Sequence, residues 1–135
     1  RMSDKPAQNL DKRIDAIESG YEFMLAYAAQ GRDTDRGAGG SASEVRDFLV
    51  AMEGALEGLG AAVKAAAGAQ DAEAAERSIE FLNAVDQDGK RAQGVIRLVL
   101  AQQAISSQLI DNVNASIHLR ALLTDLFVLD EALKN

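Results

Sequence analysis

The residues of this 135-residue chain that are best placed to do chemistry form a polar stripe in its C-terminal part. Plotted at helical spacing, six polar side chains lie within about 80° of one another in an otherwise apolar segment: Gln103, Ser107, Asp111, Asn114, His118 and Asp125. His118 is the only histidine, and an imidazole can titrate near neutral pH. The functional interpretation is a polar pocket between helices for a small organic molecule, anchored by Asp111, Asn114 and His118. Ser107 is the fourth predicted ligand-binding residue.

Two other interpretations of the stripe do not involve a ligand. The first, which we favour, makes it the solvent-exposed face of a helix, because polar side chains are mostly exposed. The second makes it a buried polar layer that fixes helix register or the choice of partner, as polar core positions do in coiled coils. The burial of His118 separates these cases, because an exposed imidazole would exclude the pocket.

Catalysis by Asp111 and His118 as acid and base is the least favoured interpretation, since nothing in the sequence marks a substrate site. The chain has no cysteine, which excludes thiolate catalysis and thiolate metal ligands. A single histidine cannot supply the paired Glu-x-x-His motifs of di-iron bundles, and the HExxH motif is absent. We therefore predict no enzymatic activity, no cofactor and no metal site.

The charge of the chain limits its partners. Its formal net charge is -7 at pH 7, and no basic patch is evident, so nucleic acid is an improbable partner. No apolar stretch approaches the roughly 18 residues that a membrane span needs. With no signal peptide visible, we expect the protein to be cytoplasmic.

The elements that must position the polar stripe are helices. Hydrophobic residues, mainly alanine and leucine among the helix formers, make up 47% of the chain, and there is one proline. We predict an all-α, up-and-down bundle of about four helices in a single domain over residues 9–135, preceded by a disordered tail at 1–8. A flexible Gly-rich loop is expected at 31–42. Apolar periodicity and capping residues predict helices over about 9–31, 43–68, 71–86 and 90–133. Asp71 is expected to cap the third helix, and Glu73 to pair with Arg77. A break or kink is expected at 86–89.

The last of these segments is long and apolar. Between residues 90 and 133, apolar side chains point in nearly every direction around a helix, which is typical of a buried central helix. One helix of this length would measure about 60 to 65 Å and would overrun its neighbours. It therefore either breaks near Asn112 to Ser116 or protrudes and pairs with a second copy.

The chain has more apolar faces than a single bundle needs. Phe23 and Tyr27 lie outside the main stripe of the first helix, and Gly54 and Gly58 belong to a ridge of small residues that another helix could approach. The predicted interface residues are Phe23, Tyr27, Gly54, Gly58, Leu126 and Phe127. We expect a non-enzymatic protein of the adaptor or regulatory type, acting through helix-mediated self-association as a homodimer or through binding another protein.

Overall fold

A computed structural model describes residues 5–36 and 41–134, with the backbone alone at 41–43, 117 and 118. The described residues form seven α-helices and no strand, so the all-α prediction is confirmed. The helices are α1 (Lys5–Ala28), α2 (Ser41–Leu56), α3 (Leu59–Gln70), α4 (Ala72–Arg77), α5 (Ile79–Leu100), α6 (Ser107–Ala115) and α7 (Ile117–Lys134).

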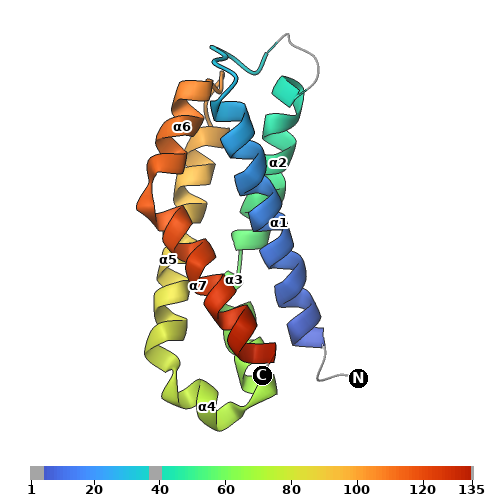
Figure 1. Ribbon diagram of the computed structural model, residues 1–135, viewed down its shortest axis with the longest axis vertical. Helices are drawn as coiled ribbons and strands as arrows, with labels where there is room; N and C mark the ends of the chain where they lie inside the picture. The colour runs from blue at the N-terminus through green and yellow to red at the C-terminus, as the bar shows by residue number, and fades with distance from the viewer. Residues whose placement is uncertain (1–4, 37–40, 135) are drawn as a thin grey trace.

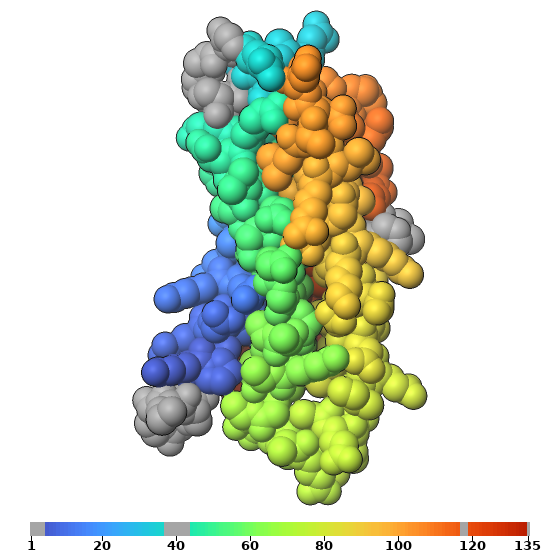
Figure 2. All heavy atoms as spheres, turned by 180° about the vertical axis from the view of Figure 1, so that it is seen from behind, coloured from blue at the N-terminus to red at the C-terminus, as the bar shows by residue number. Residues whose placement is uncertain are grey.

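The helices lie along one long axis. Figure 1 shows α1 and α5 running in one direction, α2–α3 and α6–α7 running in the other, and α4 crossing the lower end. Seen from behind in Figure 2, α2 and α3 lie beside α5. Helix α1 packs against α2, α3, α6 and α7, while α5 packs against α2, α3 and α7. Apolar side chains of the other six helices meet in one buried core, and the partly buried Ala75 of α4 packs against it.

Helix α1 begins at Lys5, four residues before the predicted start at Asn9. Residues 5–8 are therefore helical and not part of a disordered tail, and residues 1–4 lie outside the described residues. Pro6 is compatible with this early start, because the first turn of a helix does not need the N–H that proline lacks.

The predicted second helix is two helices, α2 and α3, joined at Gly58. This glycine has φ 72°, in the left-handed region where a side chain would be strained. Arg13 of α1 donates from Nη1 to the carbonyl oxygens of Ala55, at 3.0 Å, and Glu57. These bonds satisfy carbonyl groups that the end of α2 leaves without helical partners. Gly58 therefore turns the chain between α2 and α3, and its place in an interface stays a prediction.

Helix α5 is continuous, so the break predicted at 86–89 is wrong. Gly89 is buried, and a Cβ atom there would lie 3.2 Å from Cδ2 of Leu59 in α3. Close packing of α3 on α5 compensates for the weak helix propensity of glycine. The ion pair between Asp86 and Lys90, at 3.3 Å, lies one helical turn apart and crosses the predicted break.

Residues 90–133 do not form one long helix. The chain reverses direction over residues 101–106, between α5 and α6, and the break expected near 112–116 is present at Ser116, where ψ is 126°. Three helices with independent orientations explain why the apolar residues seemed to surround one axis. Ser106 begins α6 as its N-cap, with its hydroxyl accepting the N–H of Leu109 at 3.0 Å.

Candidate functional site

Ser107, a predicted ligand-binding residue, is used by the fold itself. It is buried at the start of α6. Its hydroxyl donates to the carbonyl of Tyr27 at 2.7 Å and accepts the N–H of Arg32 at 2.9 Å, and its own N–H donates to the carbonyl of Arg32 at 2.8 Å. Because both functions of the hydroxyl are satisfied within the chain, Ser107 joins α6 to the end of α1.

Asp111 and Asn114, two other members of the polar stripe, have different surroundings. Asp111 is exposed and lies, with Ser107, along a shallow depression beside Arg32 and Asp33. Asn114 is buried, and neither Oδ1 nor Nδ2 of its amide has a hydrogen-bond partner among the described residues. The side chain of His118 lies outside the described residues. The stripe therefore combines a structural serine, a solvent-exposed carboxylate and an unpaired buried amide.

We expect Asn114→Leu to raise the free energy of unfolding by about 1 to 3 kcal/mol, because leucine has a similar shape and removes a buried amide whose desolvation is uncompensated. Urea denaturation followed by circular dichroism measures this. Asn112→Leu, at an exposed position of the same helix, is the control and should change stability by less than about 0.5 kcal/mol. Destabilisation by Asn114→Leu would mean that the amide is bonded to a ligand, a partner chain or a neighbouring side chain.

A polar cluster that the sequence analysis did not identify joins two loops at the upper end of the molecule. Asp35 is only 8% exposed; its Oδ1 accepts the N–H of Ile105 at 2.8 Å, and its Oδ2 pairs with Nε of Arg46 at 2.6 Å. Arg46 also donates to the carbonyls of Leu100 and Gln102, at 3.2 and 2.7 Å. These bonds fasten the α1–α2 loop to the turn between α5 and α6.

This cluster changes the prediction of a flexible loop at 31–42. Residues 31–36 are non-helical, residues 37–40 lie outside the described residues, and α2 already includes 41 and 42. Within the described part, Asp35 is anchored by the bonds given above, and Arg36 donates from Nε to the carbonyl of Gln103. In the sequence, the only indication of this cluster was an acidic residue, Asp35, in a Gly-rich segment. An acidic residue in such a segment is equally consistent with a solvent-exposed loop.

The hydrogen bonds of Asp35 favour the charged form of its carboxyl group. Burial alone would raise the pKa of its carboxyl, but the hydrogen bonds from the Ile105 N–H and Arg46 outweigh burial and lower the pKa below its usual value of 3.8. Nearby, Tyr27 is fully buried and its hydroxyl donates to the carbonyl of Ile105 at 2.6 Å. Burial, followed by the negative charge of Asp35, raises the pKa of the Tyr27 phenol.

Two carboxyl pairs flank α7. Asp125 lies in hydrogen-bonding contact with Asp88 of α5, and burial, then Asp88, raise the pKa of Asp125 above 3.8. Asp130 lies in the same kind of contact with Asp11 of α1, and burial, then Asp130, raise the pKa of Asp11. Like charges at these contacts oppose the packing of α7 at neutral pH.

We expect Asp125→Asn to stabilise the protein at pH 7 by roughly 0.5 to 1 kcal/mol, the size of charge-pair effects near a surface. A raised folded-state pKa means that the favourable contribution of the protonated carboxyl is complete below 3.8 and is lost as the pH rises through the raised pKa. The gain of the variant over the wild type should therefore shrink towards acid pH. Asp111→Asn, at an exposed carboxylate, serves as the control in parallel melts at pH 3.5 and 7.

The structure removes two of the predicted interface residues from any surface contact. Tyr27 and Leu126 are both 0% exposed and belong to the core of the chain. Phe23 is half-buried and stacks on Phe48 of α2, with ring centroids 4.2 Å apart, so its second apolar direction is filled within the chain. Gly54 is exposed, and a Cβ atom there would meet nothing within 4 Å.

Phe127 is the large apolar residue of the predicted set that reaches the surface. It is 45% exposed, its neighbour Val128 is 57% exposed, and Leu25 of α1 is 48% exposed. Leu25 and Phe127 line one depression between α1 and α7, and Phe127 and Val128 line a second one along α7. We call the surface formed by these and the neighbouring exposed residues the α7 face: Leu25, Arg120, Ala121, Thr124, Phe127, Val128, Glu131 and Ala132.

The α7 face combines exposed apolar residues with charged residues near its two ends. Its exposed residues recur every three or four positions, which is the spacing of a helix face that packs on another helix. A basic residue, Arg120, stands near one end and an acidic residue, Glu131, near the other. Among the described residues, neither forms an ion pair. The face therefore has an apolar centre and opposite charges at its two ends, and Glu131 is close enough to Lys134 to contribute to its raised pKa.

Comparisons of the chain with protein-family models, with curated proteins and with solved structures found no match. Within the described residues, no helix is long and apolar enough to cross a membrane.

Proposed function

We propose that the protein is a non-enzymatic, cytoplasmic bundle of four antiparallel helical columns that acts by self-association through the α7 face. The observation that carries the proposal is the exposure of Phe127 and Val128 side by side on a helix whose opposite side is already buried in the core. Contiguous exposed apolar surface on a folded chain is typical of a protein–protein contact. A second copy is the occupant we propose, as in the homodimer expected from the sequence.

Charge complementarity supports a second copy rather than an unrelated partner. In a twofold symmetric contact, residue i of one chain meets residue j of the other, and residue j meets residue i. If two α7 helices pack antiparallel about an axis midway between Thr124 and Phe127, Arg120 of each copy lies close to Glu131 of the other. The opposite charges of the face then meet twice in each dimer, while the apolar centre is covered.

The polar stripe is a weaker basis for function. Catalysis by Asp111 and His118 would need a positioned pair, whereas Asp111 is exposed and the neighbouring Ser107 is held by the end of α1. The α7 face needs no rearrangement of the chain to make contact.

The test is the mass of the protein in solution by size-exclusion chromatography with light scattering. The wild type should have twice the chain mass of 14.3 kDa, and Phe127→Glu should have the mass of one chain, because a carboxylate would be buried in the contact. Leu98→Glu is the matched control: Leu98 is 62% exposed on α5, outside the α7 face, and its substitution should leave the dimer intact. Equal masses for the two variants would refute the proposed surface.

A further inference from the structure

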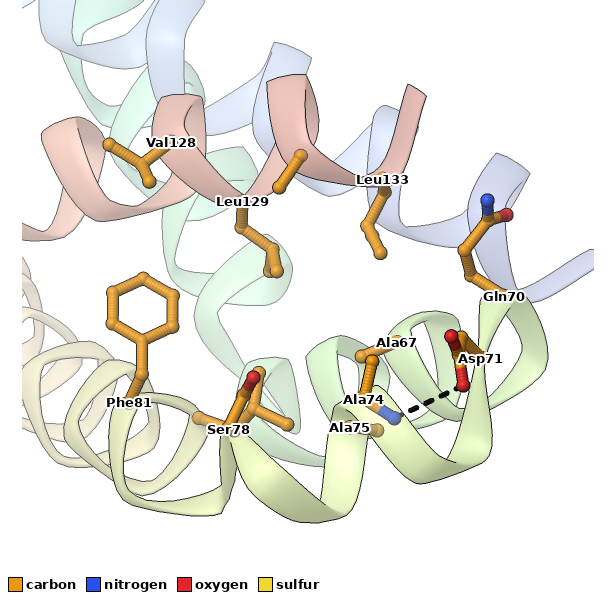
Figure 3. Close-up of a pocket in the computed structure, with 12 residues that line it drawn as sticks. Ala67, Gln70, Asp71, Ala74, Ala75, Ser78, Phe81, Val128, Leu129 and Leu133 are labelled. Carbon is orange, nitrogen blue, oxygen red and sulfur yellow. Dashed lines mark hydrogen bonds between the residues drawn. The ribbon is translucent and has the colours of Figure 1, made fainter. Parts of the chain in front are cut away.

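A groove separates the C-terminal half of α7 from α4 and the start of α5. Its volume is about 360 Å³, at the lower end of the range for small-molecule sites. Figure 3 shows Val128 and Leu129 of α7 opposite Phe81 and Ser78, and Leu133 of α7 opposite Ala67 and Ala74. The groove shares Val128 and Ala132 with the α7 face but extends to the other side of α7, away from Leu25 and Phe127.

Helix α4, which forms one wall of the groove, is short and packs against the core through the partly buried Ala75. This helix has six residues, none of them fully buried. Ala74 and Ala75 present only methyl groups to the groove, and Ala67 of α3 does the same. Small side chains on this wall leave a space that the longer side chains of α7 do not fill.

The chemistry of the walls is largely aliphatic. Apart from the aromatic ring of Phe81, the apolar lining consists of alanine, leucine and valine side chains. Polar groups are confined to Gln70, Asp71 and Ser78, and the carboxylate of Asp71 already accepts the N–H groups of residues 73 and 74, both at 3.1 Å. The groove thus offers an apolar body with a few polar groups on the α3–α4 side.

The charge around these polar groups disfavours an anion. Asp71 itself lines the groove, and the helix that begins there carries Glu73 and Glu76. Arg77, the base of that helix, is paired with Glu73 at 2.7 Å. An anionic head group would meet Asp71 with no unpaired cation supplied by α4, whereas an alcohol or an amine could bond to Ser78, Gln70 or Asp71.

We propose that the groove between α4 and α7 binds a small molecule with one short aliphatic chain and an uncharged or cationic head group. The chain lies against Phe81, Leu129 and Leu133, and the head group lies towards the Gln70 and Asp71 end of the groove. This site and the proposed self-association surface share Val128 and Ala132, and the two are tested separately through Phe127, which does not line the groove.

The test uses N-phenyl-1-naphthylamine, an uncharged probe whose fluorescence rises in apolar surroundings, followed by displacement with three molecules of equal chain length. Decan-1-ol and decylamine should displace the probe from the full chain, and decanoate should be weaker by about tenfold or more. Equal displacement by all three would overturn the proposed head-group selectivity, and no fluorescence rise would overturn the site.

Substitutions locate the bound probe. Ala75→Phe and Ala74→Phe, which fill the groove from α4, should each weaken probe binding about tenfold, whereas Ala72→Phe, at an exposed position of the same helix, should not. Circular dichroism establishes that each variant is folded. Substituting two groove positions keeps the test valid if one of the two variants fails to fold. Phe127→Glu should bind the probe as the wild type does, so that loss of the dimer and loss of the groove remain distinguishable. Equal binding by Ala74→Phe, Ala75→Phe and Ala72→Phe would place the probe elsewhere and refute the proposal.

Discussion

Replacing Gly60 by alanine is expected to lower the free energy of unfolding by about 2 to 3 kcal/mol, through overpacking of a core contact. A Cβ atom at Gly60 would lie 1.9 Å from Oδ1 of Asp86 and 2.6 Å from its Cβ. Rotation of the Asp86 side chain could move the carboxylate away, but its Cβ is fixed by the backbone of α5. Helices α3 and α5 must therefore separate to admit one methyl group, and chemical denaturation followed by circular dichroism measures the cost.

Gly54→Ala is the matched control for this experiment. Gly54 also lies inside a helix, but a methyl group there would meet nothing within 4 Å. The substitution should stabilise the protein by about 0.5 to 1 kcal/mol, because alanine is the better helix former. If Gly60→Ala proved as stable as Gly54→Ala, the close approach of α3 to α5 would be wrong.

Asp35→Ala is expected to lower the free energy of unfolding by about 3 kcal/mol. This value is at the lower end of the range for breaking a buried ion pair, because the side chain of Arg46 is partly exposed to water. The substitution leaves the N–H of Ile105 without its acceptor and Arg46 without its carboxylate. Asp33→Ala, at an exposed position of the same loop, is the control and should change stability by less than about 0.5 kcal/mol. Thermal or urea melts of both variants provide the comparison.

The loss of folding stability caused by Asp35→Ala should also depend on pH. Because the folded-state pKa of Asp35 is lowered, the stability that its charge provides is complete above the unfolded value of 3.8. That stability is lost as the pH falls through the lowered pKa. The difference between wild type and variant should thus be constant from pH 5 to 7 and shrink in strong acid. A difference that grew on acidification would contradict the assigned contacts.

Local signals predicted the helices well where a cap or pair marks them. Asp71 is a helix N-cap as expected, with its carboxylate accepting two backbone N–H groups, and the predicted Glu73–Arg77 pair is present at 2.7 Å. The single helix predicted over 71–86 is wrong, because α4 ends at Arg77 and α5 begins at Ile79. Glycines were harder to interpret. Gly58 turns the chain, whereas Gly89 lies within a helix against Leu59, and only the packing partner distinguishes the two roles.

The turn at 101–106 has no glycine or proline to mark it. Its backbone is held by distant side chains, with Arg46 bonded to carbonyls at 100 and 102 and Asp35 bonded to the N–H of Ile105. Tertiary hydrogen bonds of this kind leave no local pattern in the sequence. Missing this turn merged the C-terminal part of α5 with α6 in the predicted helix over 90–133.

The prediction of the interface residues was also affected by the unknown orientation of α7. Leu126 and Phe127 are adjacent in sequence and were assigned to one interface, but Leu126 is buried and Phe127 is 45% exposed. Adjacent residues on a helix point about 100° apart, so the orientation of α7 against its neighbours decides which one reaches solvent. That orientation depends on the break at Ser116 and on the packing of α7 against α1 and α5, which periodicity alone does not provide.

The most direct measurement of the central claim is sedimentation equilibrium of a charge-swap cycle on the α7 face. The wild type should be a dimer, Arg120→Glu and Glu131→Arg should each dissociate more readily, and the double variant Arg120→Glu/Glu131→Arg should regain the dimer because the opposite charges again meet across the twofold axis. A wild type that sediments as a single chain at every concentration would contradict self-association. A double variant that is as weak as either single variant would contradict the antiparallel contact of two α7 helices.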